Sequence, residues 1–297
     1  MNYPLYICGP TASGKSGLAL QLAKQLDGEI VNADAYQLYR GLETIAASPT
    51  KDEQGQVPHH LYSVLEPTAP LDANRYCQLA LPVIAEIQSR GKTPLLVGGS
   101  GLYLKFLTHG PSPVPSGDAK IRAELAQLSL EELEARLRTL DPAEAEQVNL
   151  KNRRYLTRSL ELCLLTGQPI SQLRSDWDNP DPPHLRGLYL DWPREEIIER
   201  IAQRTKLMLS HGAIDEIAVL PSTATTAAKA IGVAEIREHL AGKLTLAEAS
   251  ERITIATRQY AKRQRTWFRK EGWLTSIPRN ELPPNLPTLL SSNRSSN

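Results

Sequence analysis

One eight-residue motif near the start of the chain constrains its fold more than any other feature. Residues 9–16 are Gly-Pro-Thr-Ala-Ser-Gly-Lys-Ser, which completes the pattern G-x-x-x-x-G-K-[ST] directly after the apolar segment Tyr3–Cys8. In such a loop, backbone N–H groups point at phosphate oxygens, the lysine adds positive charge and the serine hydroxyl can bind Mg²⁺. A helix that follows, with Leu18, Leu22 and Leu26 on one face, would aim its positive end at the same anion. The motif therefore predicts a strand, a phosphate-binding loop and a helix, and the alternative is a plain surface turn.

Length and composition are those of an ordinary globular protein. The 297 residues can bury a full core and allow two domains, and the contents of 41% apolar and 23% charged residues are typical. No apolar run approaches the roughly 18 residues of a membrane span, and the start has no signal-peptide pattern. We therefore expect a cytoplasmic protein without a membrane partner. Cys8, Cys77 and Cys163 are widely spaced, which favours reduced core residues over disulfides or a zinc site.

A basic segment late in the chain indicates a polyanion partner. The net charge is only +1, but residues 252–270 contain seven basic side chains and no acidic one. Thr245 and Glu248 form a capping-box pattern, so a long helix is expected from about Leu246. A merely solvated helix, which is the alternative, would alternate the sign of its charges. The expected buried face is Ala249, Ile253, Ala256, Tyr260 and Trp267, and the expected basic face is Arg258, Lys262, Arg265 and Arg269.

The first third of the chain alternates between strand and helix patterns. Short apolar runs lie at Tyr3–Cys8, Glu29–Ala33 and Thr93–Val97, with helical patterns at Ser16–Leu26 and Ala73–Arg90 between them. This alternation is typical of a mainly parallel sheet with helices on both sides. We therefore expect an α/β fold with a P-loop NTPase-like core.

A helical insertion is expected to interrupt this core. After the proline-rich residues 110–117 the signals are helical: Ser129 and Glu132 form a capping box, Asp141-Pro142 begins a helix, and another ends at Gly167. A strand is expected at Gly187–Leu190, and helices from Pro193 through Lys270. The predicted division is a first part of the core at 1–113, a helical insertion domain at 114–186, a continuation of the core with the basic helix at 187–279, and a disordered tail at 280–297.

Three groups of residues fall where ligand sites of α/β proteins form, beyond the carboxyl ends of strands. Asp34 follows the second predicted strand, with Gln37 one turn on, and can act as a base or hold a Mg²⁺-bound water. Ser100 lies in the glycine-rich run 98–101, which follows the third predicted strand. That strand has no aspartate at its end, so Asp34 is the carboxylate available at these strand ends. Arg200 and Arg204, four residues apart on a predicted helix, suit a phosphate clamp. The pair His59-His60 lacks metal-ligand spacing and is expected in a loop.

Five segments, taken in order along the chain, resemble the tRNA dimethylallyltransferase (isopentenyl-tRNA transferase) family. The first is the glycine loop, which many kinases share; the others include Pro-His-His-Leu at 58–61 and Asp-Ala-Tyr-Gln-Leu-Tyr-Arg-Gly at 34–41. The most specific are Leu-Val-Gly-Gly-Ser-Gly-Leu-Tyr-Leu at 96–104 and Thr-Arg-Gln-Tyr-Ala-Lys-Arg-Gln-Arg-Thr-Trp-Phe at 257–268. The resemblance covers residues 3 to about 273.

The resemblance implies a reaction and a set of site residues. In this family the loop holds dimethylallyl diphosphate with Mg²⁺, and N6 of the adenosine at tRNA position 37 attacks the allylic carbon while diphosphate leaves. The implied catalytic residues are Asp34 as general base, Arg204 as phosphate clamp and Ser100 as the hydroxyl of a Gly-Gly-Thr motif, with Ser16 as the Mg²⁺ ligand. Gln37 would contact the adenine edge of a nucleotide withdrawn from its stack.

The implied binding residues form two sets. For diphosphate they are Gly9, Thr11, Ala12, Ser13, Gly14, Lys15 and Ser16. The tRNA anticodon arm would contact the insertion and the basic helix through its phosphates, and no obligate protein partner is expected. The tRNA set is Asp34, Ala35, Tyr36, Gln37, Arg122, Arg154, Arg158, Arg258, Lys262 and Arg265.

The chain departs from the family pattern at several positions, and alternatives stay open. The family usually has serine at Ala35, lysine at Ser48, aspartate at Asn152 and tyrosine at Val233. One alternative is a P-loop small-molecule kinase that uses ATP. Another keeps the prenyl donor but uses a free adenine nucleotide as acceptor. A third, which the departures suggest, is a catalytically weakened RNA-binding paralogue.

Overall fold

The chain forms two compact units. The computed structural model describes residues 3–111, 115, 117–177 and 185–279. One unit comprises Met1–Thr108 with Asp181–Asn297, and the other is His109–Pro180. The boundaries predicted from the sequence, at 114 and 186, lie a few residues from this division. The tail predicted to be disordered, 280–297, lies outside the described residues, as do parts of both predicted linkers.

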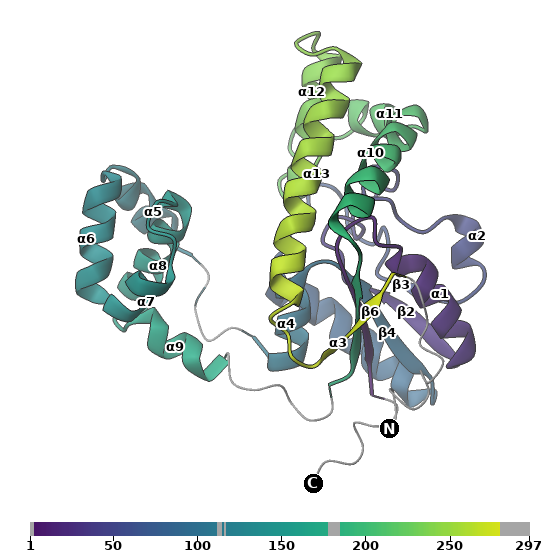
Figure 1. Ribbon diagram of the computed structural model, residues 1–297, viewed down its shortest axis with the longest axis horizontal. Helices are drawn as coiled ribbons and strands as arrows, with labels where there is room; N and C mark the ends of the chain where they lie inside the picture. The colour runs from purple at the N-terminus through teal and green to yellow at the C-terminus, as the bar shows by residue number, and fades with distance from the viewer. Residues whose placement is uncertain (1–2, 112–114, 116, 178–184, 280–297) are drawn as a thin grey trace. The chain divides into compact units, whose positions relative to one another are not determined.

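The larger unit contains a parallel sheet of six strands in the order β3-β2-β4-β1-β5-β6 (Figure 1). Four of these strands were predicted. The missed strand β3 consists of the two histidines expected in a loop, and β6 is a half-exposed edge strand without a continuous apolar run. The strands are β1 (Leu5–Cys8), β2 (Gly28–Asn32), β3 (His59–His60), β4 (Thr93–Gly98), β5 (Gly187–Asp191) and β6 (Leu274–Pro278).

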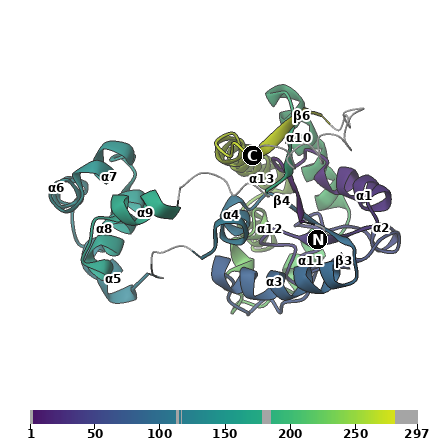
Figure 2. The ribbon, with the colours of Figure 1, turned by 90° about the horizontal axis from the view of Figure 1, so that it is seen from below.

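Helices cover both sides of the sheet, as predicted (Figure 2). On one side, α1 (Lys15–Gln25) and α10 (Arg194–Ser210) pack on alternate strand residues such as Leu5 and Ile7. α3 (Ala73–Ser89) and α4 (Gly101–His109) contribute Tyr76 and Tyr103, whose rings stack with centroids 4.6 Å apart. The Tyr76 hydroxyl donates to the Asn32 carbonyl of β2 at 2.9 Å, which fixes α3 against the strand end that precedes Asp34.

Of the remaining helices of this unit, α11 and α13 pack against α10, and α12 packs against both α11 and α13. α13 packs beside both α10 and α12, as Figure 1 shows. Thr245 caps α13 in the predicted capping box with Glu248. In the described part of the chain, no helix combines the length and apolar character that a membrane span requires. These helices are α2 (Lys51–Gln54), α11 (Ala213–Ala218), α12 (Val233–Leu240) and α13 (Leu246–Phe268), with a 3₁₀ turn at Ala227–Lys229.

The buried face of α13 differs from the predicted one. Ala249 and Ile253 are buried as expected, but Ala256, Tyr260 and Trp267 are only partly covered. Two polar residues take part in the buried face because their side chains are satisfied internally: the Thr257 hydroxyl donates to the Ile253 carbonyl at 2.7 Å, and Gln264 bonds to two backbone groups described below. The observed face is Ala249, Ile253, Thr257, Ala261, Gln264 and Phe268.

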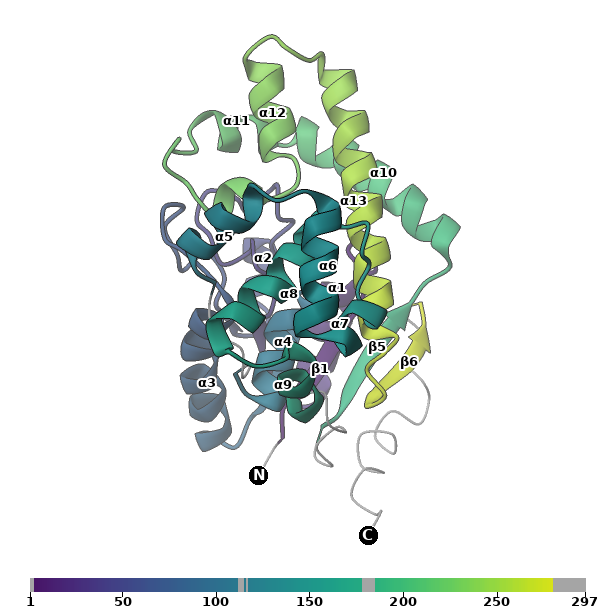
Figure 3. The same ribbon diagram turned by 90° about the vertical axis from the view of Figure 1, so that its left-hand side faces the viewer.

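The smaller unit is a helical bundle with its own core, which Figure 3 shows around α6 and α8. The predicted capping box of Ser129 and Glu132 is present, and the predicted stop at Gly167 has the left-handed φ of 66° that favours glycine. Leucines of α5, α6 and α8 fill the core. The helices are α5 (Ala119–Ala126), α6 (Leu130–Leu140), α7 (Pro142–Gln147), α8 (Arg153–Thr166) and α9 (Ile170–Trp177).

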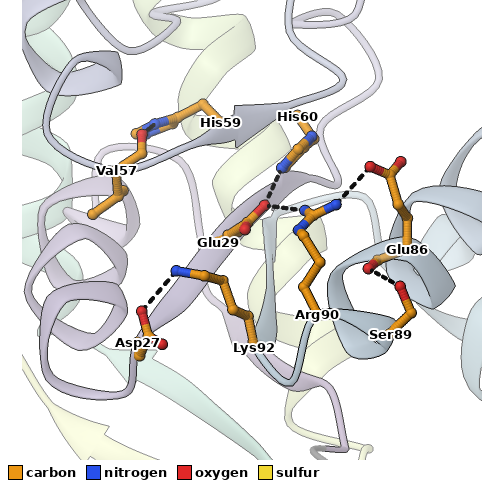
Figure 4. A network of polar contacts seen from close by, with 9 residues as sticks. All are labelled: Asp27, Glu29, Val57, His59, His60, Glu86, Ser89, Arg90 and Lys92. Atoms are coloured by element: carbon orange, nitrogen blue, oxygen red, sulfur yellow. Dashed lines mark hydrogen bonds and ion pairs between the residues drawn. The ribbon is translucent and has the colours of Figure 1, made fainter.

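A buried carboxylate joins β2, β3 and the end of α3 (Figure 4). Glu29 is only 3% exposed, and its Oε2 lies 2.7 Å from His60 Nε2 and 2.8 Å from Arg90 Nη2. Burial by itself would raise the pKa of Glu29, but the hydrogen bonds and charges of His60 and Arg90 together lower it below its ordinary value. The contact between His60 and Glu29 therefore has a structural role. It explains why the two-residue strand β3 stays paired with β2 at the edge of the sheet.

We expect Glu29→Gln to lower the free energy of unfolding at pH 7 by about 1–3 kcal/mol, because it weakens two charge-assisted hydrogen bonds to a buried group. Because the folded-state pKa of Glu29 is depressed, this stabilisation is present above the ordinary glutamate pKa of about 4.3 and is lost as the pH falls through the folded value. Urea unfolding at several pH values measures it. Glu86→Gln, a control whose side chain is 69% exposed, should change stability by less than about 0.5 kcal/mol. Equal effects of the two variants would contradict the prediction.

Candidate active site

The loop between β1 and α1 is built to receive an anion. Gly14, which precedes α1, has φ 84°, and no side chain in the described part of the chain caps the first N–H groups of the helix. Ala12 also has a left-handed φ of 64°, so the loop curls back toward the helix start. The Ser13 hydroxyl is fully buried and has no hydrogen-bond partner among the described residues. Open backbone donors at a helix N-terminus form a site for phosphate oxygens.

The loop borders a pocket of about 370 Å³ that gathers most of the predicted catalytic and diphosphate-binding residues. Asp34 and Gln37 come from the segment after β2, and Arg204 comes from α10, so three distant parts of the sequence meet here. Gly9, Ser13 and Ser100 lie behind this surface and do not line it. The predicted residues that do line the pocket are Thr11, Ala12, Gly14, Lys15, Ser16, Asp34, Gln37 and Arg204.

Two cations and one carboxylate dominate the electrostatics of this pocket. Burial lowers the pKa of Lys15 to about 8; Asp34 acts in the opposite direction, and Arg204 lowers the value further. Burial also lowers the pKa of Arg204, against the influence of Asp34. Lys15 Nζ donates to the Pro10 carbonyl at 2.9 Å. Because the two cations have lost hydration and share a single carboxylate, an anion that binds here regains favourable interactions for both.

Arg200, predicted together with Arg204 as part of a phosphate clamp, also supports the loop. Its Nε donates to the Ala12 carbonyl at 2.7 Å, and its guanidinium lies 4.5 Å from the ring centroid of Trp192. Arg200 lines the same pocket. It therefore holds the left-handed Ala12 in place while it adds positive charge to the site.

The backbone around Asp34 orients its carboxylate. Asp34 Oδ1 accepts a hydrogen bond from the Tyr36 N–H at 3.0 Å, and the Asp34 N–H donates to Asn32 Oδ1 at 2.8 Å. Asn32 is fully buried and donates from its own amide to the Leu61 carbonyl at 2.9 Å. The carboxylate is therefore fixed at the end of β2 and faces the cations of the pocket.

Ser100 connects two strand ends behind the pocket. Its hydroxyl accepts a hydrogen bond from the Ala35 N–H at 3.1 Å, next to Asp34. The glycines around it are required by close approach: a Cβ on Gly98 would collide with the Ala33 backbone, and one on Gly101 with the Trp267 ring. The groups that approach these glycines closely therefore belong to the protein itself.

Gln264 is a site residue that the sequence pattern did not single out. Its Oε1 accepts a hydrogen bond from the Thr11 N–H at 2.7 Å, and its Nε2 donates to the Gly99 carbonyl at 3.0 Å. This amide, buried on α13, joins the phosphate-binding loop to the loop after β4. The only signal in the sequence is its place in the run 257–268, because a helical pattern alone assigns glutamine to the solvent face.

The structure divides the residues predicted to bind tRNA into several groups. In the segment after β2, the Tyr36 hydroxyl donates to the Lys229 carbonyl at 3.1 Å, and Gln37 Nε2 donates to the Ala46 and Ala47 carbonyls at 3.1 and 2.9 Å. The Gln37 amide nitrogen is therefore occupied, and its oxygen is the group left for a base edge. Ala35 contributes its backbone N–H to the bond with Ser100.

The basic face of α13 is only partly as predicted. Arg258 and Lys262 are exposed, but Arg265 is partly buried, with Nη2 3.7 Å from Asp191 Oδ1. Arg269 approaches the same carboxylate at 3.2 Å. The expectation of an unopposed cationic surface was wrong at this end, because β5 brings an acidic residue to the helix. Arg258, Lys262 and Arg265 line a groove of about 610 Å³ between α10 and α13.

In the smaller unit, a buried carboxylate opposes two of the three predicted arginines. Glu161 is 1% exposed and lies 2.7 Å from Arg122 and 2.7 Å from Arg158. Arg154 is exposed near the start of α8, where the Asn152 side chain accepts from the Arg154 N–H at 3.1 Å. Asn152, which replaces the family's aspartate, therefore keeps the capping function of that position.

Comparisons with known proteins identify the family to which this chain is similar. Residues 37–271 match the family model described as IPP transferase. The tRNA dimethylallyltransferase of Akkermansia muciniphila is 42% identical over 97% of this chain and 96% of that protein. The enzyme of the same name from Geobacter metallireducens is 41% identical over 96% of this chain and 94% of that protein.

Solved structures show the same fold. The tRNA isopentenylpyrophosphate transferase of Bacillus halodurans has a TM-score of 0.70 and 31% identity, over 99% of this chain and 95% of that one. A eukaryotic dimethylallyltransferase that acts on tRNA has a TM-score of 0.78 and 26% identity, over 99% of this chain and 78% of that one. The predicted P-loop NTPase-like α/β fold is thus confirmed. With matches of this length and identity to named relatives, and with its motifs gathered around one pocket, the chain belongs to the IPP transferase family.

Proposed function

We propose that this protein transfers a dimethylallyl group from dimethylallyl diphosphate to N6 of the adenosine at position 37 of tRNA and releases diphosphate. The observation that carries the proposal is one pocket in which Lys15, Arg204 and the open N-terminus of α1 face Asp34. The cations suit the diphosphate, and the carboxylate suits the removal of a proton from the attacking amine. Relatives that carry the name tRNA dimethylallyltransferase support this choice over the kinase alternative.

The reaction makes one bond and breaks another. N6 of the adenine attacks C1 of the prenyl group, the C1–O bond breaks, and its electron pair leaves with the diphosphate. The N6 proton passes to the Asp34 carboxylate. Lys15 and Arg204 stabilise the negative charge that grows on the leaving group, and the fixed loop holds C1 in line for attack. Positioning and charge stabilisation, without a covalent enzyme intermediate, are sufficient for this chemistry.

Ser16 fits a Mg²⁺ ion held mainly by the diphosphate. Among the described residues no group of three histidine, cysteine, aspartate or glutamate side chains could hold a metal by itself. Mg²⁺ characteristically takes one or two protein oxygens and completes its shell with phosphate oxygens and water. The Ser16 hydroxyl lines the pocket and supplies one such oxygen. When bound, the ion would neutralise charge on the leaving diphosphate.

The tRNA is recognised, in this proposal, through phosphate contacts and one withdrawn base. Arg258 and Lys262, which are exposed on α13, suit the phosphates, as does Arg154 in the smaller unit. The Gln37 oxygen suits the N6–H edge of adenine, because its amide nitrogen is already occupied. We infer that Ser100 is a positioning residue, since its hydroxyl binds the backbone beside Asp34 and does not line the pocket.

One assay tests the proposal directly. The protein is incubated with isotopically labelled dimethylallyl diphosphate, Mg²⁺, AMP and unmodified tRNA. The digested tRNA and the free nucleotides are both analysed for N6-prenylated adenosine by mass spectrometry, and a gel shift measures tRNA binding. Label at position 37 supports the proposal. Label on free AMP in place of tRNA, or tRNA binding without transfer, would overturn it in favour of a nucleotide prenyltransferase or an RNA-binding paralogue. Thermal stabilisation by ATP and Mg²⁺ but not by dimethylallyl diphosphate would favour a kinase.

We expect Asp34→Ala to lower kcat at least about 100-fold with little change in tRNA affinity, because it removes the base from an otherwise assembled site. Single-turnover transfer and a gel-shift titration measure the two quantities. Asp215→Asn, which removes an exposed carboxylate outside the pocket, is the control. An unchanged turnover in Asp34→Ala would remove this residue from the mechanism.

The affinity for inorganic diphosphate should depend on pH through Lys15. Because its pKa in the free protein is about 8, Lys15 is charged below that pH and must take up a proton to bind the anion above it. The dissociation constant should therefore rise above pH 8 by up to about tenfold per pH unit. Diphosphate itself also ionises with pH, and Lys15→Gln is the control for that effect. In calorimetric titrations, the dissociation constant of Lys15→Gln should lack the part of the rise that comes from Lys15. Parallel pH curves for the two proteins would refute the assignment.

A further inference from the structure

The active-site pocket has an apolar end that the chemistry above does not use. Ala46, Ala47 and Val97 line it together with Leu207 of α10. Leu207 is 59% exposed, so a large apolar side chain stays in contact with water beside three cationic side chains. A ligand that joins an apolar group to a diphosphate would cover this side chain, which is favourable because apolar surface leaves water.

Leu207 lies at a short, fixed distance from the anion-binding end of the pocket. It follows Arg204 by three residues on α10, so the two side chains project from the same side of the helix and both line the pocket. An apolar group attached to a phosphate at Arg204 therefore meets Leu207 within one helical turn, about 5 Å along the axis. This spacing suits a five-carbon group better than a ten-carbon one.

Ala46 and Ala47, which also line the pocket, belong to a loop that four hydrogen bonds hold in a strained conformation. The Glu216 carboxylate accepts from the Thr44 N–H at 2.6 Å and from the Ile45 N–H at 3.0 Å, and Gln37 donates to the carbonyls of Ala46 and Ala47. Ala47 has a left-handed φ of 52°, a conformation that persists only where its surroundings impose it.

Buried packing holds the same loop from behind. Ile45 is 5% exposed and packs so closely on Gly232 that a Cβ there would come within 2.7 Å of its side chain. The loop is therefore a fixed wall, with two small methyl groups on its pocket side. A loop fixed at four backbone groups and packed from behind does not open readily to admit a larger ligand.

We propose that Ala46, Ala47 and Leu207 form the wall that limits the prenyl donor to a five-carbon group, and that Glu216 is the positioning residue that holds this wall. The inference rests on the proposed function and adds donor-size selection to it. Glu216 acts through the loop and touches no reacting atom.

The test is a competition between two donors. Dimethylallyl diphosphate (five carbons) and geranyl diphosphate (ten carbons) are supplied at equal concentration with unmodified tRNA, and mass spectrometry measures the ratio of ten-carbon to five-carbon product. Leu207→Ala should raise this ratio at least about tenfold over the wild-type protein. Leu240→Ala, which removes a leucine that is 48% exposed and outside the pocket, should leave the ratio unchanged.

Glu216→Gln tests the positioning residue. Glutamine replaces one acceptor oxygen by an amino group, so it can satisfy only one of the two loop N–H groups. We expect the KM for dimethylallyl diphosphate to rise about tenfold and the product ratio to rise, with the KM for tRNA unchanged and the thermal midpoint lowered by only a few degrees, about 2–4 °C per kcal/mol lost. Asp215→Asn, at the exposed neighbouring position, should behave as the wild-type protein.

The outcomes distinguish a failure of the wall from a failure of the proposed function. If the wild-type protein forms no product with either donor, both the proposed function and the inference about donor size are refuted. The wild-type protein could transfer the five-carbon group while Leu207→Ala and Glu216→Gln both give the same ratio of ten-carbon to five-carbon product as the wild-type protein. That result would refute the inference about the wall and leave the proposed function standing. Unchanged binding of inorganic diphosphate by both variants shows that the anion-binding end is intact.

Discussion

The larger unit is organised around the proximity of two cations, Lys15 and Arg204, in a pocket that offers them a single carboxylate. Burial and mutual repulsion both oppose this arrangement, and the lowered pKa of Lys15 is its direct expression. Such a site is tolerated only where the surrounding structure imposes it. In the proposed function, the diphosphate of the donor would supply the negative charge that Lys15 and Arg204 lack in the free protein.

Several elements that touch no ligand impose this arrangement. Gln264 of α13 binds the phosphate-binding loop and the loop after β4, so a single amide ties these two loops together beyond the paired ends of β1 and β4. Arg200 holds Ala12 from the side of α10, and Asn32 sets the backbone from which Asp34 projects. The sequence pattern of the basic helix α13 indicated only a polyanion partner. In the structure the same helix also supports the active site through Gln264. In the proposed function, the same helix would couple tRNA binding at Arg258 and Lys262 to the geometry of the phosphate-binding loop.

Much of the fold was predictable because it follows from local rules. The strands β1, β2 and β4 are short apolar runs, and the capping boxes at Ser129 and Thr245 mark helix starts within the few residues that make them. β3 and β6 were missed because edge strands gain their pairing from neighbours and not from an apolar pattern. The buried face of α13 was misassigned because Thr257 and Gln264 are polar in sequence, and only internal hydrogen bonds allow their burial.

The sequence by itself determined the phosphate-binding loop, the strand-end carboxylate at Asp34 and the family, since each is encoded in contiguous residues whose spacing has a direct physical reading. Only the tertiary structure decided how the charges of the basic helix are opposed, because Asp191 reaches Arg265 and Arg269 from a different element. It also decided that Ala46, Ala47 and Leu207 face one pocket. Such pairings between distant segments depend on the packing of the whole chain, and no local pattern of residue types carries that information.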